Sequence, residues 1–307
     1  MLKELAKKKL IISSFTFLIF VFTMLCPQVE KTNIEKTISY QTGNISPIYL
    51  LNKASYVSRT NMHLKSTSTI PKVKEIISIL TINSKDSIYI PSLFTPVIPS
   101  KTKLLSTDIQ GTTLKLKFDK NFLNIPPDSF KKMLECLVYS LTELEGIDNL
   151  LIYVNDSLLE KTPLTNEKLP LPLSREMGVN KMNSMHKLTN TMSTTAYYIA
   201  KEQDYTYYIP VTFISNENKQ KVEVIIEELK TRPNLNTNLI SYLHANASLT
   251  NYELLNEEIK LSFNSYLLEG LPTKTMQEEV KYSIALSMKD SLHVKEVNIQ
   301  VQKEKKP

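Results

Sequence analysis

The chain repeats one arrangement of apolar residues about 145 to 150 positions later, and this internal duplication limits its fold more than any other feature. In each copy a short segment holds four apolar residues at helical spacing, which are Val73, Ile76, Ile77 and Leu80 in the first copy and Val222, Ile225, Ile226 and Leu229 in the second. This spacing lines one face of a helix. Everything after the N-terminal segment is therefore predicted to be one domain present twice.

An alternating strand pattern also occurs in both copies, as GTTLKLKF and NEEIKLSF. Alternation with a period of two predicts a strand with one buried face. Gly111 and Asn256 stand just before these strands, and both residue types adopt left-handed turn conformations at low cost. Ile109 and Leu254 are thus predicted to lie on a preceding paired strand, which gives each copy a hairpin.

A longer helix and a final strand close each copy. The apolar residues of the helix are Met133, Leu137 and Leu141 in the first copy and Val280, Ile284 and Met288 in the second. Those of the strand are Ile147, Leu150, Ile152 and Val154, and then Val294, Val297, Ile299 and Val301. With opening strands near Ile48–Leu51 and Tyr207–Phe213, the order is strand, helix, strand, strand, helix, strand. The predicted fold class is α+β, with two tandem small α/β sandwich domains.

The same patterns set the expected boundaries, which are an anchor or uncleaved signal-like segment at 1–27, a juxtamembrane linker at 28–46, a first domain at 47–156, a linker at 157–204, a second domain at 205–303 and a charged tail at 304–307. The linker is rich in Lys, Pro, Thr and Asn, and its run KLPLPLS resists helix formation. In the first domain, SIYI has a strand-like pattern, and the three prolines within Pro91–Pro99 indicate an ordered extended loop.

The N-terminus indicates the compartment. Four lysines within the first nine residues precede an uncharged segment, Leu10–Cys26, which as a helix would extend about 26 Å. The basic flank places the short N-terminus inside. Because no alanine occurs between Ala6 and Ala54, an A-x-A-like cleavage site is missing and an uncleaved anchor is favoured. The predicted location is membrane-anchored and extracytoplasmic.

Cys26 has two interpretations. It stands where a bacterial lipoprotein carries its lipidated cysteine, but TMLC places the bulky Leu25 where that pattern needs a small residue. The alternative is a cysteine near the end of a membrane span. Cys136, the other of the two cysteines, falls within a predicted helix, so no intramolecular disulfide framework is expected.

The sequence offers no catalytic, cofactor-binding or metal-binding motif. With five glycines it has no P-loop, GxGxxG or GxSxG motif, and its four histidines form no H-E-x-x-H or i, i+4 pair. Cys136 lies beside an apolar helical stripe and is Ser283 in the second copy, which favours a buried structural thiol. Glu143 and Glu145 resemble an acid pair, but carboxylates at a helix end are usually exposed. The net charge of +6 is spread too thinly to indicate nucleic-acid binding. The chain is predicted not to be an enzyme and to need no cofactor.

The run VIPSKTKLLSTDIQGTTLKLKFDKNF, followed by a helix ending VYSLTELEGIDNLLIYVND, resembles the GerMN domain of endospore-forming bacteria. The family's features are an I-P-x-x-T-K-L turn, a helix ending in T-E-L and a following G-I/V strand; here they are Ile98–Leu104, Thr142–Leu144 and Gly146–Ile147. The second copy keeps the apolar skeleton but has KDSLH in place of T-E-L-x-G. Its assignment rests on the duplication.

The resemblance implies a non-enzymatic structural protein of sporulation or germination, similar to the ring-building modules of secretion machines. It implies a scaffold or assembly factor in the space between the mother-cell and forespore membranes, with other sporulation envelope proteins as partners. Candidate contact residues are Lys115, Lys117 and Lys260 on the predicted strands, with a solvated strand face as the alternative. The competing functions are binding of peptidoglycan, for which the 15 tyrosines could serve, and wall processing.

Overall fold

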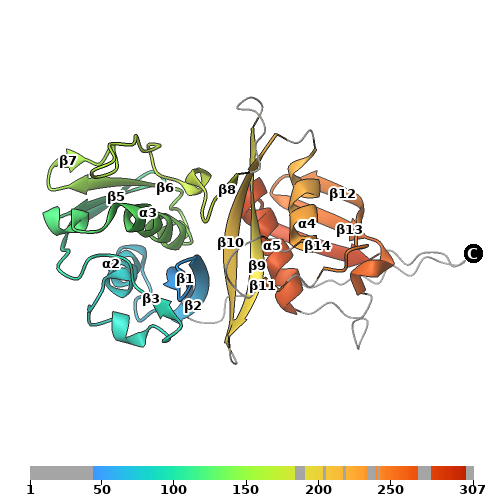
Figure 1. Cartoon of the computed structure of the whole chain (residues 1–307), viewed down its shortest axis with the longest axis horizontal. Helices are drawn as coiled ribbons and strands as arrows, with labels where there is room; N and C mark the ends of the chain where they lie inside the picture. The colour runs from blue at the N-terminus through green and yellow to red at the C-terminus, as the bar shows by residue number, and fades with distance from the viewer. Residues whose placement is uncertain are drawn as a thin grey trace, which may run out of the picture.

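The computed structural model describes residues 44–183, 191–202, 205–216, 219–231, 233, 239–240, 243–268 and 278–301. Over these residues the chain forms two domains of the same architecture, which lie side by side and share a central sheet (Figure 1). The predicted α+β class and the predicted duplication are confirmed.

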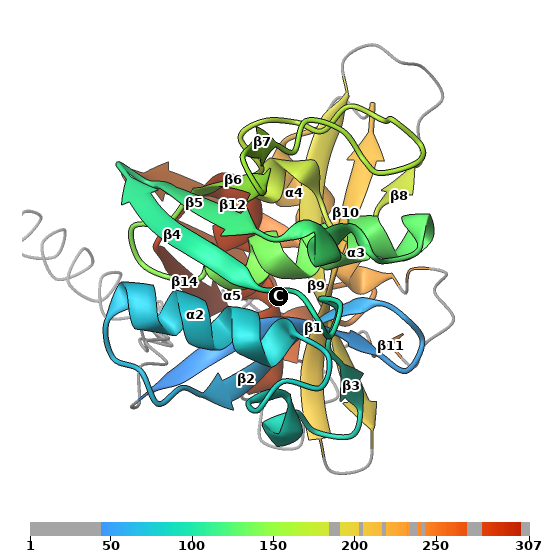
Figure 2. The ribbon, with the colours of Figure 1, turned by 90° about the vertical axis from the view of Figure 1, so that its left-hand side faces the viewer.

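The first domain begins with a hairpin and ends with a four-stranded sheet, whose last strand is the short β7 (Ser157–Leu158). Its elements are β1 (Ile45–Asn52), β2 (Val57–His63), α2 (Thr69–Leu80), η1 (Ser87–Tyr89), β3 (Phe94–Thr95), β4 (Leu104–Gln110), β5 (Thr113–Phe118), η2 (Lys120–Leu123), α3 (Pro127–Leu141) and β6 (Asn149–Val154). β4 and β5 are antiparallel, whereas β6 runs parallel to β5. Figure 2 shows α2 at the front of this domain, beside β4.

The second domain repeats this order. Its elements are β9 (Met192–Glu202), β10 (Tyr205–Ser215), α4 (Lys221–Lys230), β11 (Leu239–Ile240), β12 (Leu249–Leu255), β13 (Glu258–Phe263), η4 (Ser265–Leu268), α5 (Glu278–Leu292) and β14 (Glu296–Val301). β12 and β13 are antiparallel and β14 is parallel to β13, as in the first domain. In chain order, β7, η3 (Arg175–Met177) and β8 (Met182–Asn183) come between β6 and β9, and β7 pairs with β6.

The predicted hairpins and helices are found where the patterns placed them. Gly111 and Asn256 have φ angles of 60° and 55° in the β4–β5 and β12–β13 turns, a conformation that glycine and asparagine tolerate. The alternating apolar residues of β5 and β13 are fully buried. Aromatic rings pack together in the core of the first domain. The Phe122 ring stacks on that of Phe118, with ring centroids 4.4 Å apart, and forms an edge contact with that of Phe130, with centroids 6.2 Å apart.

Three predictions about strands are wrong. Each domain opens with a hairpin rather than one strand, and Tyr207–Phe213 belongs to β10, the counterpart of β2. β9 lies inside the segment predicted as the 157–204 linker, so the second domain starts earlier than residue 205. SIYI forms the turn η1 and exposes Ile88 and Tyr89. The prolines after it lie in an ordered loop, in which β3 pairs with β1.

The linker is packed along the domains. Leu173 exchanges both backbone hydrogen bonds with Leu150 of β6, at 2.8 and 2.9 Å. Leu169, Leu173 and Val179 are buried. β8 adds to the second domain by pairing in parallel with β10. The linker therefore contacts both domains before β9 begins.

One sheet runs through both domains in the order β11-β9-β10-β2-β1-β3, and its central contact is the pairing of β10 with β2. These strands are antiparallel, with Tyr208 opposite Arg59. Where the ladder would continue, Asn180 of the linker intervenes. Its Nδ2 donates to the carbonyls of Val57 and Pro210, both at 2.8 Å, while its Oδ1 accepts from the Val57 N–H at 3.0 Å and from Lys132 at 2.8 Å.

In each domain a serine of the long helix bonds a backbone N–H of the first strand. The Tyr49 N–H of β1 donates to Ser140 Oγ of α3 at 2.9 Å, and the Tyr197 N–H of β9 donates to Ser287 Oγ of α5, also at 2.9 Å. In α5, Ser283 also donates to the Tyr197 carbonyl. The counterpart of Ser283 is Cys136 of α3, a free and buried cysteine.

Replacing Ser140 or Ser287 by alanine is expected to lower the free energy of unfolding by about 1–2 kcal/mol in either domain, since a buried strand N–H loses its acceptor. Equilibrium urea unfolding measures both values. Ser106→Ala, at an exposed position of β4, is the control and should change stability by less than about 0.5 kcal/mol. Values for Ser140 and Ser287 that match the control would contradict the assigned role.

Candidate functional site

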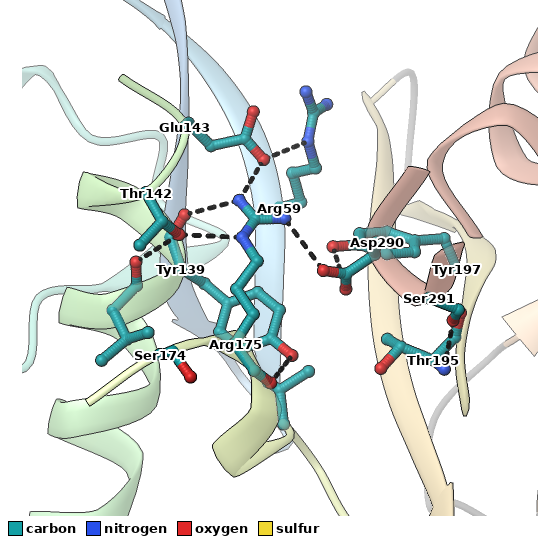
Figure 3. A network of polar contacts seen from close by, with 12 residues as sticks. Arg59, Tyr139, Thr142, Glu143, Ser174, Arg175, Thr195, Tyr197, Asp290 and Ser291 are labelled. Atoms are coloured by element: carbon teal, nitrogen blue, oxygen red, sulfur yellow. Dashed lines mark hydrogen bonds and ion pairs between the residues drawn. The ribbon is translucent and has the colours of Figure 1, made fainter. Parts of the chain in front are cut away.

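The candidate site is a polar cluster where the two domains meet, centred on Arg175 of the linker (Figure 3). Arg175 bridges one carboxylate from each domain, because its Nη2 lies 2.7 Å from Glu143 Oε1 and its Nη1 lies 3.2 Å from Asp290 Oδ1. Its guanidinium also donates to Thr142 Oγ1 at 2.8 Å and to the Tyr139 carbonyl at 3.1 Å. One guanidinium thus joins the end of α3 to the end of α5.

Aromatic rings surround this cation. The Arg175 guanidinium carbon lies 4.9 Å from the ring centroid of Tyr139 and 5.8 Å from that of Tyr49. The two rings meet edge to face at 5.3 Å. Such rings attract a cation and also keep water away from its ion pairs.

Two tyrosines complete the cluster and occupy equivalent positions in the two domains. Tyr49 donates to Glu143 Oε1 at 2.9 Å, Tyr197 donates to Asp290 Oδ2 at 3.0 Å, and the two hydroxyl oxygens lie 3.0 Å apart. These three contacts share only two hydroxyl protons. A proton on Asp290 would allow all three to be hydrogen bonds.

The two carboxyl groups have opposite pKa shifts. Burial would raise the pKa of Glu143, but the charges of Arg175 and Arg59 outweigh burial and lower it to about 2. For Asp290, burial is the larger effect and raises the pKa, although Arg175 opposes it. The side chain of Asp290 is 2% exposed, compared with 18% for Glu143. Glu143 is therefore the charged partner, and Asp290 holds a proton more readily.

Arg59 adds a second cation from β2. Its side chain is 4% exposed, and its Nε lies 3.7 Å from Glu143 Oε1. The guanidinium carbon lies 5.1 Å from the ring centroid of Tyr282 on α5 of the other domain. Arg59 Nε has no hydrogen-bond partner among the described residues. Arg59 therefore contacts both domains through its charge and its planar face.

A groove of about 1160 Å³ opens beside the cluster. Equivalent segments form its walls, which are the end of α3 with Asp148 on one side and the end of α5 with Lys295 on the other. Linker residues Pro170–Pro172 and Ser174–Met177 lie along it. Burial lowers the pKa of Lys289 in the second wall. The groove holds charges of both signs.

Acid should weaken the cluster through Glu143. Its pKa is about 2 in the folded chain and 4.5 as the ordinary value, so between these values the unfolded chain binds more protons and stability falls as the pH falls. We expect Glu143→Gln to lose less stability than the parent over this interval, measured by urea unfolding at a series of pH values. Asp290, with a raised pKa, acts in the opposite direction. Glu145→Gln, at an exposed position, should keep the parent's slope, and an unchanged slope in Glu143→Gln would contradict the assignment.

The predicted contact lysines lie away from this cluster. Lys115 and Lys117 are on β5, where Lys115 donates to Gln110 Oε1 at 2.6 Å and Lys117 pairs with Asp156. Lys260 is on β13, exposed, with its Nζ 3.7 Å from Glu258 Oε1. They do not form one site with Arg175. Their role as contact residues stays a prediction.

Most residues of the cluster carry no recognisable motif in the sequence. The helix-end position predicts an exposed Glu143, but its side chain is 18% exposed and binds Arg175 of the linker and Tyr49 of β1. Its counterpart Asp290 was overlooked, as were the four residues Tyr49, Arg59, Arg175 and Tyr197. Across the described residues, no three His, Cys, Asp or Glu side chains are grouped so as to hold a metal ion. The paired carboxylates bind arginine, which is an arrangement suited to holding domains together.

The predicted anchor at 1–27 and Cys26 lie outside the described residues. In the part that is described, no helix combines the length and apolar character needed to cross a membrane.

Comparisons with known proteins match both domains. The family model "Germane: Sporulation and spore germination" matches residues 47–160 and 195–306. The spore germination protein GerM of Bacillus subtilis (strain 168) is 28% identical over 280 residues, which cover 89% of this chain and 75% of that protein.

A solved structure has the same two-domain arrangement. It is that of the tandem GerMN domains of the sporulation protein GerM from Bacillus subtilis, with a TM-score of 0.76, 26% identity, and coverage of 84% of this chain and 90% of that one. The family match spans more than half of the chain and falls on both structural repeats. The chain therefore belongs to the Germane family of sporulation and spore germination proteins and carries tandem GerMN domains.

Proposed function

We propose that this protein is a membrane-anchored, extracytoplasmic assembly factor of sporulation that acts by binding other proteins and not by catalysis. Its place is the space between the mother-cell and forespore membranes, where it supports the complex that joins them. The observation that carries the proposal is the match of a sporulation family to both domains. The N-terminal segment 1–27, as an uncleaved span or through lipidated Cys26, is the proposed anchor.

The joined domains suit such a role. A shared sheet, the Asn180 hydrogen bonds and the Arg175 ion pairs hold them in one orientation. The β4–β5–β6 strands and the β12–β13–β14 strands lie on opposite sides of the shared sheet (Figure 1). Both sets of strands therefore stay available to partners. Lys115, Lys117 and Lys260 on those sheets are the proposed contact residues.

Imaging of a functional fluorescent fusion tests this proposal, using a tag that matures outside the cytoplasm. We expect signal only in sporulating cells, at the membranes around the forespore. Uniform signal around growing cells would contradict the proposal and favour a general wall-binding protein.

One observation favours the second candidate function, binding of a cell-wall polymer. Tyr89 is 60% exposed on η1 beside a groove of about 430 Å³, which Asn61, His63 and Glu75 also line. Lys65 Nζ lies 4.7 Å from the Tyr89 ring centroid and covers one face of it. Aromatic faces next to polar groups suit sugar rings.

If this second function holds, Tyr89→Ala should reduce co-sedimentation with purified peptidoglycan about tenfold, equivalent to about 1.4 kcal/mol. Tyr153→Ala, on β6 and not among the residues that line that groove, is the control. Equal sedimentation of the parent, both variants and an unrelated protein would remove this candidate.

A further inference from the structure

The two domains meet about an approximate two-fold axis. In the hairpins, Tyr49 lies opposite Arg59 and Tyr197 lies opposite Pro210, which makes Arg59 the counterpart of Pro210 and Ser58 the counterpart of Ile209. The β2–β10 ladder pairs Arg59 with Tyr208 in antiparallel orientation. Continuing that register would place Ser58 opposite its counterpart Ile209, so the contact is arranged about a pair of equivalent positions.

Side chains at the contact are related by the same approximate two-fold axis. The Tyr49 hydroxyl contacts that of its counterpart Tyr197 at 3.0 Å. Glu143 and its counterpart Asp290 bind the same guanidinium from opposite sides. Contact between each residue and its own equivalent is the defining property of an isologous interface, in which one surface binds a copy of itself.

We infer that this face, defined by β2 with Tyr49 and Glu143 in the first domain and by β10 with Tyr197 and Asp290 in the second, is a docking surface for another domain of the same type. The partner is the second domain of another copy of this chain. The contact needs no covalent connection between the domains, so halves from different chains can pair.

The charged residues favour pairing of a first half with a second half over pairing of two first halves or of two second halves. The first half, with its linker, supplies both cations, Arg59 and Arg175, whereas the second half supplies Asp290 and has Pro210 in place of Arg59. A pair of second halves would bury two Asp290 carboxyl groups with neither cation, and Pro210 has no N–H to donate. A pair of first halves would bring together four guanidinium groups and two Glu143 carboxylates. One first half with one second half balances these charges.

The test uses the full chain, purified in detergent, with a protease site inserted between residues 186 and 187, outside the described residues. Cleavage leaves Arg175 and Asn180 on the first half. Size-exclusion chromatography and native mass spectrometry then report which halves remain together. We expect one complex of one first half and one second half, and mixed complexes after two differently tagged cleaved samples are combined.

A matched variant tests whether the ion pairs of Arg175 hold the two halves together. In the cleaved Arg175→Met protein, the dissociation constant between the halves should rise by about 100-fold. Cleaved Lys161→Met, at an exposed linker position, should behave as the parent does. Separation or aggregation of the parent's halves at micromolar concentration, or persistent pairing without exchange between tagged samples, would overturn the inference. None of these outcomes depends on the proposed role in sporulation.

Discussion

Replacing Arg175 by methionine is expected to lower the free energy of unfolding by about 3 kcal/mol. Methionine keeps much of the apolar stem but removes the guanidinium that contacts Glu143 at 2.7 Å and Asp290 at 3.2 Å. Glu143 would still face Arg59, whereas Asp290, 2% exposed, would lose its cation in a buried place. Equilibrium urea unfolding at neutral pH, followed by circular dichroism, measures the change.

Lys53→Met is the matched control for this substitution. Lys53 also joins the two domains, through Glu202 at 2.8 Å, but its side chain is 60% exposed. Ion pairs in water contribute little, so its loss should cost less than about 1 kcal/mol. Adding Asp290→Asn to Arg175→Met should restore part of the lost stability, because a neutral amide replaces the buried carboxyl group that has lost its cation. Equal effects of Arg175→Met and Lys53→Met would contradict a buried role for Arg175.

Replacing Asn180 by alanine is expected to cost about 3 kcal/mol as well, for a different reason. Its side chain satisfies the Val57 N–H and the carbonyls of Val57 and Pro210 where β2 and β10 separate. Alanine would leave these buried groups without partners, at about 1–3 kcal/mol for each group that water does not reach. The same urea unfolding measurement applies.

The control for Asn180→Ala must account for the left-handed backbone conformation of Asn180. Asn180 has a φ of 44°, which alanine adopts only with strain. Asn166 has a φ of 53° and is exposed in the linker, so Asn166→Ala reports that strain alone. Asn180→Asp keeps the size and tolerates the backbone but loses the amide donor to both carbonyls. Stability of Asn180→Asp close to the parent's would show that these two bonds matter little.

The core of each domain follows from the sequence because its burial is local. Leu114, Leu116 and Phe118 alternate with lysines on β5, and the helix stripes repeat at fixed spacing, so the pattern alone indicates which face is buried. Turn chemistry at Gly111 and Asn256 then places the hairpins. These elements depend on contacts within one domain.

The contact between the domains does not follow from the sequence in the same way. β2 reads VSRTNMH and shows no apolar alternation, yet Ser58, Arg59 and Thr60 are buried. They are buried because β10 of the other domain pairs with β2. Glu143 likewise follows the end of a helix, and its contact with Arg175 of the linker cannot be read from the pattern of that helix. The apolar pattern of one domain indicates only the residues that this domain buries by itself. It does not indicate residues that become buried when the other domain packs against them.

The most direct test of this account is the yield of heat-resistant spores from cells whose own copy is replaced by one of two variants at equal protein level. The first variant lacks the candidate catalytic side chains and carries Cys136→Ser with His→Asn at His63, His186, His244 and His293. The second carries Arg175→Met with Asn180→Asp and keeps those side chains. We predict normal yield from the first and a strong loss from the second. Loss from the first with normal yield from the second would show that the protein acts through chemistry and would contradict an assembly role based on its joined domains.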